Sequence, residues 1–242
     1  MDELKLIFDP TKEHLAQIES WLIEEDMNNK NGFYCTWIII VDYFEKNRIG
    51  VLLLNDWAIG FITWSESTKM ARIEIAEVHP GHRKKSYGGF MLKSLVEALK
   101  PKGIAVLDLH CQPASSEKVW KKLGFKKFPD VPGFDKENSL KDPHLYRIIV
   151  AHLKPAKAPT SKNLLILWSV EPYQADREQP RWVWDVTFHP NSSRLTFPII
   201  IPAKRDWNLR WAIDGKTVTE NKIKKFGQNE IDFGDFLVIE SL

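Results

Sequence analysis

The chain has 242 residues and a formal net charge of +2, enough for one large or two small domains with a proper apolar core. A charge this close to zero does not favour a general nucleic-acid binder, and the ordinary composition does not favour a disordered or fibrous protein. The two cysteines, Cys35 and Cys111, are too few for a disulfide framework, so we expect both to be buried thiols in a reducing compartment.

The start of the chain indicates where the protein resides. Residues 1–5 lack the basic start and the apolar stretch of a signal peptide. The apolar run at residues 37–41 is far too short to cross a bilayer. The expected location is therefore cytoplasmic, with no membrane partner.

The first fifty residues predict one strand followed by two helices. Residues 4–8 predict the strand, and Thr11 caps a helix whose apolar side chains recur at helical spacing. Residues 28–32 predict a loop, and residues 33–47 predict a second helix. The β-branched run at 38–41 weakly favours a strand in its place.

Three strands are predicted next. Residues 49–54 and 57–64 are apolar runs joined by the turn residues Asn55 and Asp56, which indicates a hairpin. Residues 71–78 predict a third strand, which runs directly into a tight turn and a helix.

This turn carries charges and small residues suited to phosphate oxygens. The free N–H groups and the positive dipole end of a helix N-terminus attract anions, and successive loop N–H groups add to that attraction. A solvated basic cap is the alternative for a turn of this kind. The basic and small residues of the turn are Arg83, Lys84, Lys85, Ser86, Gly88 and Gly89.

The next elements alternate between helix and strand. A helix is predicted over residues 87–100 and a doubly buried strand over 104–109. Ser115 or Ser116 caps a short helix that ends at Gly124. A strand beginning at Phe125, a loop at 129–143 and a last strand at 145–151 complete this part of the chain.

Two segments of this part resemble motifs of the GCN5-related N-acetyltransferase (GNAT) superfamily. The family signature Arg/Gln-x-x-Gly-x-Gly/Ala follows a strand that often ends Val-x-Pro. Val78-His79-Pro80 matches the strand end, and Arg83 and Gly88 match the first and last signature positions, with Ser86 at the usual first glycine. Residues 114–125, ending Leu-Gly-Phe, resemble the second motif.

The resemblance implies an α+β fold, a mixed central sheet flanked by helices, over residues 1–153. It implies an N-acetyltransferase that uses acetyl-CoA as co-substrate and transfers the acetyl group directly to a small-molecule or peptide amine. The cofactor-binding residues would be Val78, Arg83, Lys84, Lys85, Ser86, Tyr87, Gly88, Gly89, Ser115 and Trp120. Backbone groups of Val78 would be free to bond the pantetheine arm.

The resemblance also bears on the proton transfers. Glu74 is the preferred general base, Glu77 is the other strand carboxylate, and His79 and His110 are weaker candidates. Trp120 stands where the family usually has an acidic tyrosine, so Tyr87 or water would protonate the thiolate. Without a dedicated acid, a non-catalytic acyl-CoA-binding scaffold is the alternative. The second helix would supply an acceptor wall, with core packing as the alternative role for Phe33, Tyr34 and Trp37.

The remainder of the chain has a different pattern. Residues 154–162 predict a linker, and residues 163–242 predict a small all-β domain, a sandwich or a barrel. Asp214-Gly215 is a strong hairpin signal. Five tryptophans here favour core filling over a stacking ligand or partner site: Trp168, Trp182, Trp184, Trp207 and Trp211. Strands are expected at 164–170, 182–188, 195–201, 207–213 and 236–240.

Other partners are not indicated by the sequence. The histidines and cysteines have no metal-ligand spacing, so no metal is expected. The lysines between residues 118 and 127 fit a solvated helix face, and no ladder of stacking aromatics accompanies them, so no nucleic acid is expected. A homodimer is compatible with this organisation.

Overall fold

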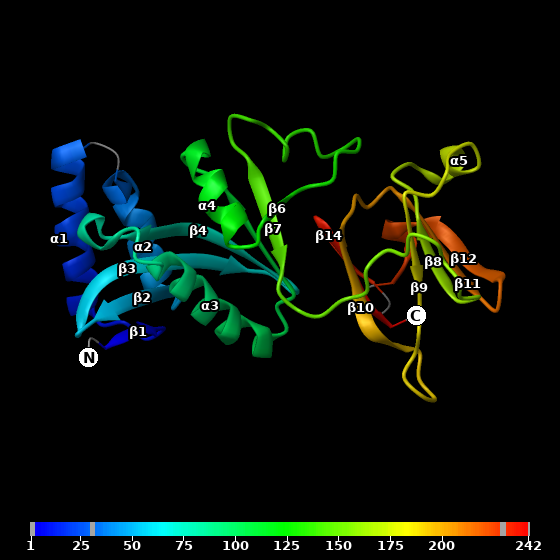
Figure 1. Cartoon of the computed structure of the whole chain (residues 1–242), viewed down its shortest axis with the longest axis horizontal. Helices are drawn as coiled ribbons and strands as arrows, with labels where there is room; N and C mark the ends of the chain where they lie inside the picture. Colours follow the sequence, from blue (N-terminus) through cyan, green and yellow to red (C-terminus); the bar gives the residue numbers. More distant parts are fainter. Residues whose placement is uncertain (1–2, 30–31, 228–230, 242) are drawn as a thin grey trace. The chain divides into compact units, whose positions relative to one another are not determined.

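The computed structural model describes residues 3–29, 32–227 and 231–241 of the chain (Figure 1). The chain divides into two compact units. The first contains Met1–Lys126 and Lys141–Ile149, and the second contains Lys127–Leu140 and Val150–Leu242. The candidate site lies within the first unit.

A seven-stranded mixed sheet forms the centre of the first unit. Its strand order is β1-β2-β3-β4-β5-β7-β6. The β4–β5 pair is parallel, and β1–β2, β2–β3, β3–β4 and β5–β7 are antiparallel. The strands are β1 (Leu4–Ile7), β2 (Ile49–Leu54), β3 (Trp57–Glu66), β4 (Met70–Val78), β5 (Val106–His110), β6 (Lys126–Lys127) and β7 (His144–Ile148).

Four α-helices accompany this sheet: α1 (Lys12–Asn29), α2 (Trp37–Glu45), α3 (Tyr87–Leu99) and α4 (Glu117–Lys122). The expected mixed sheet with flanking helices is confirmed. A 3₁₀ turn at Phe33–Thr36 continues into α2, so the β-branched run at 38–41 is helical and the strand alternative is wrong. Helix α1 extends to Asn29, into the predicted loop, of which residues 30 and 31 lie outside the described chain. Within the described residues, no helix has the length and apolar character to cross a membrane.

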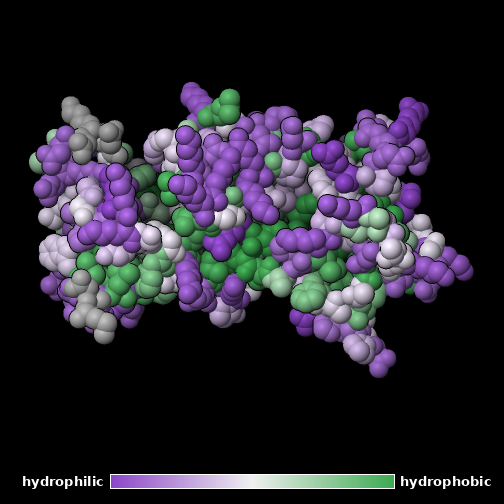
Figure 2. All heavy atoms as spheres, viewed as in Figure 1, coloured by the Kyte–Doolittle hydropathy of each residue, from purple (hydrophilic) through white to green (hydrophobic). Residues whose placement is uncertain are grey.

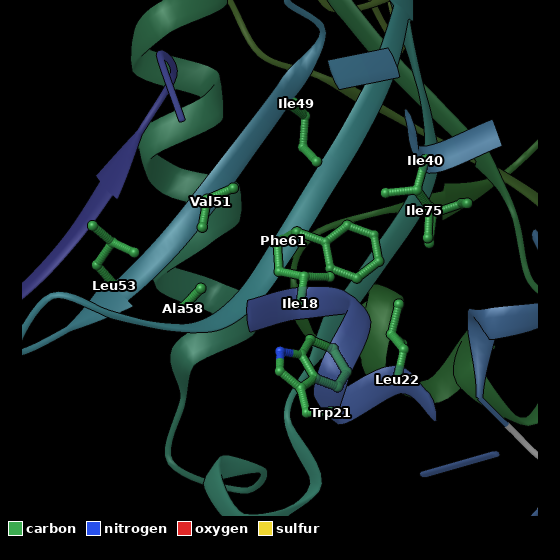
Figure 3. Close-up of a cluster of buried hydrophobic side chains, with 10 residues drawn as sticks. All are labelled: Ile18, Trp21, Leu22, Ile40, Ile49, Val51, Leu53, Ala58, Phe61 and Ile75. Atoms are coloured by element: carbon green, nitrogen blue, oxygen red, sulfur yellow. The ribbon is translucent and has the colours of Figure 1, made fainter. Parts of the chain in front are cut away.

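Helices cover both faces of the sheet. Neighbouring residues of β2 point to opposite sides, so they pack against different helices. Val51 packs with residues of α1 and α2, whereas Leu52 packs with Met91 of α3. Figure 3 shows Trp21 of α1 close to Phe61 of β3 in the first of these cores. Hydrophilic side chains cover most of the face seen in Figure 2, with hydrophobic side chains in smaller patches.

The expectation for the cysteines holds at one position only. Cys111 is buried, but Cys35 is exposed in the 3₁₀ turn before α2. The prediction for Cys35 is therefore wrong. A turn between two helices leaves part of its side chains in solvent, and composition alone does not show which ones.

A β-bulge and a short parallel pairing open the sheet at β4. Ile73 lies opposite Trp64 and Ile75 opposite Thr63, so Glu74 is an extra residue in β4 relative to β3. The pairing of β4 with β5 covers only Met70–Ile73. The second half of β4 therefore parts from β5, and bulges of this kind redirect side chains next to functional sites.

The second unit contains two antiparallel sheets, ordered β10-β14-β13 and β12-β11-β8-β9. The five predicted strands are all present. Asp214 and Gly215, with φ of 49° and 78°, form the predicted turn and lead into an unpredicted strand, β12. The elements are β8 (Leu164–Leu167), α5 (Pro172–Ala175), β9 (Trp182–Asp185), β10 (Arg194–Pro202), β11 (Asn208–Ile213), β12 (Lys216–Lys222), β13 (Asp232–Phe233) and β14 (Phe236–Ser241).

Most of the segment between β6 and β7, as far as Leu140, belongs to the second unit rather than to the first. Phe134 is completely buried, with its ring centroid 5.2 Å from that of Phe128 and 5.7 Å from that of Trp207. The expected linker is also part of this unit, because the Ala156 N–H donates to the Val183 carbonyl of β9.

The tryptophans of the second unit mostly fill its interior. Trp168, Trp184 and Trp207 are each at most 5% exposed, and Trp182 stacks on Trp207 with 5.6 Å between centroids. This placement favours the predicted core role over a ligand-stacking role.

Candidate active site

A cavity of about 1040 Å³ lies in the first unit, where β4 parts from β5. This cavity, called the groove below, is lined by five segments: the second half of β4, the turn before α3, the end of β5, α4 and the inner face of α2. One end of this groove meets the N-terminus of α3, and another part meets the bulge at Glu74. The turn predicted to bind phosphate and the carboxylate predicted to act as general base thus line one cavity.

The turn before α3 has the geometry of an anion-binding loop. Lys84 and Ser86 both have φ of 65°, in the left-handed region. Ser86 occupies the N-cap position without a side-chain hydrogen bond, and α3 begins at Tyr87. The first N–H groups of a helix lack intrahelical acceptors. A Cβ added to Gly88 would meet no heavy atom within 4 Å, so a ligand can approach the backbone there.

The serine that departs from the family signature is held in a strained conformation. A left-handed backbone costs a non-glycine residue roughly 1–2 kcal/mol, whereas glycine adopts it freely. We expect Ser86→Gly to raise the free energy of unfolding by about 1 kcal/mol, after the greater chain entropy of glycine is subtracted. Urea denaturation measures this change. Ser115→Gly is the control, and an equal or lower midpoint for Ser86→Gly would contradict the expectation.

Most of the residues predicted to bind the cofactor line this groove. Lys85 and Ser115 do not line it, and Ser116, the next residue along, takes the place expected for Ser115. The predicted base Glu74 lines the same cavity. The predicted cofactor residues found there are Val78, Arg83, Lys84, Ser86, Tyr87, Gly88, Gly89 and Trp120.

The Arg83 side chain is directed at protein groups. Its Nε donates to the Val78 carbonyl at 2.9 Å, and its Nη2 lies 2.5 Å from Glu25 Oε1 and 2.9 Å from Glu77 Oε1. The Val78 N–H donates to Glu77 Oε1 at 3.1 Å. The expectation of free Val78 backbone groups is therefore corrected, because both groups have partners. Arg83 instead fixes the turn to α1 and β4.

This ion-pair cluster makes a pH-dependent contribution to stability. Burial raises the pKa of Glu77, although the positive charge of Arg83 opposes that rise. An acid with a raised pKa stabilises the fold most at low pH, and its contribution falls as the pH rises through the folded-state pKa. Without Arg83 this loss of stability with rising pH is larger, because the ionised carboxylate of Glu77 loses its partner.

We therefore expect Arg83→Met to lower the free energy of unfolding by about 2 kcal/mol at neutral pH. The loss is smaller near pH ~5, where more of Glu77 is protonated. Urea denaturation at both pH values measures it, with the exposed neighbour Lys85→Met as the control. An identical loss at both pH values would show that Glu77 does not control the effect.

Glu74 lies at the bulge with two hydroxyl groups beside it. Its Oε1 accepts a hydrogen bond from Ser65 Oγ at 2.6 Å, and it interacts with the phenol of Tyr43 on α2. Burial, with the negative charge of Glu74 added, raises the pKa of Tyr43, so the phenol stays protonated at neutral pH. The carboxylate is exposed and can receive a proton from a ligand in the groove.

The buried carboxylate of Asp108 on β5 pairs with Arg72, which precedes Glu74 on β4. Asp108 is 1% exposed, and its Oδ2 lies 2.6 Å from Arg72 Nη2 and 2.6 Å from His144 Nε2. Burial alone would raise the pKa of Asp108, but these hydrogen bonds outweigh burial and hold it below the usual range. His110 stacks on His144 with 4.1 Å between centroids. Burial, followed by the proximity of His144, lowers the pKa of His110, which is therefore mostly neutral at pH 7.

Sequence reasoning identified some groove residues and missed others. Phe33 lines the groove, whereas Tyr34 and Trp37 pack against the core between α1 and the sheet. The structure adds residues that the sequence analysis did not select: Thr36, Ile39, Tyr43, Arg72 and His82. A signal existed for α2, since residues 33, 36, 39 and 43 recur at helical spacing, but nothing marked that face as open rather than buried.

A metal does not fit the described residues. In the ranges 3–29, 32–227 and 231–241, no three His, Cys, Asp or Glu side chains are grouped as metal ligands would be.

The chain is similar to known proteins in sequence and in structure. The family model described as acetyltransferase (GNAT) family matches residues 3–125. No curated protein matches the sequence. Ard1 from Thermoplasma volcanium is a similar solved structure, with 16% identity over 62% of this chain and 99% of its own, at a TM-score of 0.47.

Two further solved structures have the same degree of similarity. PaiA N-acetyltransferase from Thermoplasma acidophilum, in complex with coenzyme A, is 16% identical over 60% of this chain and 99% of its own, with a TM-score of 0.47. An N-acetyltransferase from Staphylococcus aureus Mu50 is 19% identical over 61% of this chain and 99% of its own, with a TM-score of 0.46.

Proposed function

Because the chain belongs to the acetyltransferase (GNAT) family, we propose that it transfers an acetyl group from acetyl-CoA to an amine. One observation carries the proposal: a single groove joins a helix N-terminus suited to the pyrophosphate with a carboxylate suited to deprotonating the amine. The cofactor's phosphates would lie at the N–H groups of Tyr87, Gly88 and Gly89. Its acyl arm would follow the opening between β4 and β5.

The reaction proposed is a direct transfer with both substrates bound. The amine nitrogen attacks the thioester carbonyl carbon, a C–N bond forms, and the C–S bond breaks. Before the attack the ammonium gives one proton to Glu74, directly or through water, and the nitrogen loses a second proton to solvent as the amide forms. The leaving thiolate takes a proton from solvent or from a groove hydroxyl, which solvent then reprotonates. Holding both reactants in one groove replaces a bimolecular encounter, which is a large part of the rate gain.

The leaving thiolate of CoA also needs a proton donor. Trp120 lines the groove where the family usually has tyrosine, and an indole cannot supply this proton. Tyr87 lines the groove and is half-buried at the start of α3, so it is the phenol we propose for this role. Solvent is the alternative donor.

A second candidate function follows from the same tryptophan: a scaffold that binds acyl-CoA without catalysis. The test is release of free CoA thiol when the full chain is incubated with acetyl-CoA and a panel of amines. Amine-dependent release at a rate proportional to enzyme concentration is expected. Binding of acetyl-CoA with no amine-dependent release from any panel member would support the scaffold instead.

A further inference from the structure

The wall of the groove that α2 supplies has an apolar surface beside the proposed reaction centre. Residues 33, 36, 39 and 43 are separated by three or four positions, so they share one face of the helical segment, and all four line the groove. Ile39 on this face is 49% exposed, which leaves a large apolar side chain uncovered beside the cavity. A ligand that covers Phe33 and Ile39 gains free energy from the apolar area removed from water.

The charged residues next to this apolar surface favour a ligand that carries an ammonium group and no carboxylate. Glu74 is exposed, and within the part of the chain that the structure describes it accepts hydrogen bonds from the hydroxyls of Ser65 and Tyr43. The guanidinium of Arg72, which also lines the groove, is bonded to the buried Asp108 through both Nε and Nη2, at 3.0 and 2.6 Å. An ammonium group therefore finds a negative partner here, whereas a substrate carboxylate would meet the like charge of Glu74.

We propose that the acceptor is a small primary amine with an aromatic or branched aliphatic body and no carboxylate near the amine. Its ammonium group lies at Glu74, and its apolar body covers Phe33 and Ile39. This inference rests on the proposed acetyl transfer and specifies the substrate class of the same groove. The apolar wall selects against polyhydroxylated amines, because it offers their hydroxyl groups few partners.

The test compares acceptors that differ by one group. Phenethylamine and phenylalanine share a ring and an amine but differ by a carboxylate, and glucosamine presents an amine on a polar body. With saturating acetyl-CoA and the full chain, we expect kcat/KM for phenethylamine to exceed that for phenylalanine by roughly 100-fold or more. An equal or higher value for phenylalanine or glucosamine would overturn the proposal.

Two neighbouring residues of α2 provide a matched pair of variants. Ile39 lines the groove, whereas Ile38 is 85% exposed and is not part of its lining. We expect Ile39→Asp to raise KM for phenethylamine about tenfold or more, and Ile38→Asp to leave it unchanged, because only the first charge meets the apolar body. The KM for acetyl-CoA should stay the same in both variants. Equal effects of the two substitutions on the amine would overturn the assignment of this wall.

The failure of this inference can be separated from a failure of the proposed function. One outcome is that acetyl-CoA turns over with an amine of a different class and that Ile39→Asp does not change the KM for that amine. This outcome would retain acetyl transfer and reject the apolar acceptor. Acetyl-CoA binding with no turnover of any amine would reject both and leave the scaffold function. Absence of acetyl-CoA binding would reject the entire assignment of the groove.

Discussion

Gly88→Trp is expected to lower the affinity for acetyl-CoA at least about 100-fold, or roughly 2.7 kcal/mol, while the fold is retained. A Cβ at this position meets no heavy atom within 4 Å, so the protein itself does not oppose a β-carbon there. The indole would instead fill the space through which the pyrophosphate approaches the first N–H groups of α3. Equilibrium dialysis with labelled acetyl-CoA measures the loss.

Gly88→Ala is the size control for this experiment. It keeps the same backbone N–H and adds only a methyl group, so a loss of no more than about threefold is expected, together with a gain in helix stability of about 0.5–1 kcal/mol. Thermal unfolding of all three proteins verifies that each is folded. Wild-type affinity in a folded Gly88→Trp protein would show that the cofactor does not lie at this turn.

Glu74→Gln is expected to lower kcat by about 10²–10⁴-fold, the range found when a positioned general base is removed. The amide is nearly the same size and keeps an acceptor oxygen for Ser65, so the local geometry at the bulge is preserved. It cannot accept the proton of the ammonium group. The dissociation constant for acetyl-CoA should not change, because the proposed phosphate site lies at the turn before α3 and not at Glu74.

Glu97→Gln is the control for that substitution. Glu97 lies on α3, its side chain is 65% exposed, and its nearest basic group is Lys93 at 4.0 Å, outside the groove. Its kcat should equal that of the wild type. If Glu74→Gln retained wild-type kcat with every acceptor that turns over, the role of general base would pass to another residue of the groove, such as His110.

The fold of the first unit follows from local features that can be recognised in the sequence. Asn55 and Asp56 form the hairpin turn with φ of 49° and 63°, as their ability to adopt the left-handed region predicts. Gly103 and Gly124, with φ of 84° and 90°, lie where the helices before them end. These features depend on neighbouring residues alone, and that is why the order of helices and strands could be predicted.

The partners of the site side chains could not be predicted in the same way. The place of Arg83 in the signature predicts a contact with phosphate, but its guanidinium binds Glu25, 58 positions earlier in the chain. Tyr43 reaches Glu74 from α2, and Arg72 reaches Asp108 across the sheet. Such pairings depend on tertiary packing, and no local pattern encodes them.

The boundary of the second unit could not be predicted either, because it also depends on tertiary packing. Residues 129–143 are rich in turn-forming residues, which correctly indicates a loop between β6 and β7. Phe128, just before this loop, packs with Phe236, and Phe134 within it packs with Trp207, while Lys204 Nζ lies 2.8 Å from Glu137. The aromatic residues of this loop were visible in the sequence, but the unit that they would join was not.

Calorimetric titration of the wild-type chain with acetyl-CoA tests the central claim most directly. The account predicts a single site with a dissociation constant of about 1–100 µM, a range typical of enzyme substrates. Its heat should disappear in Gly88→Trp and persist in Glu74→Gln. No heat at millimolar acetyl-CoA, or equal binding to the Gly88→Trp protein, would contradict the assignment of this groove to the cofactor.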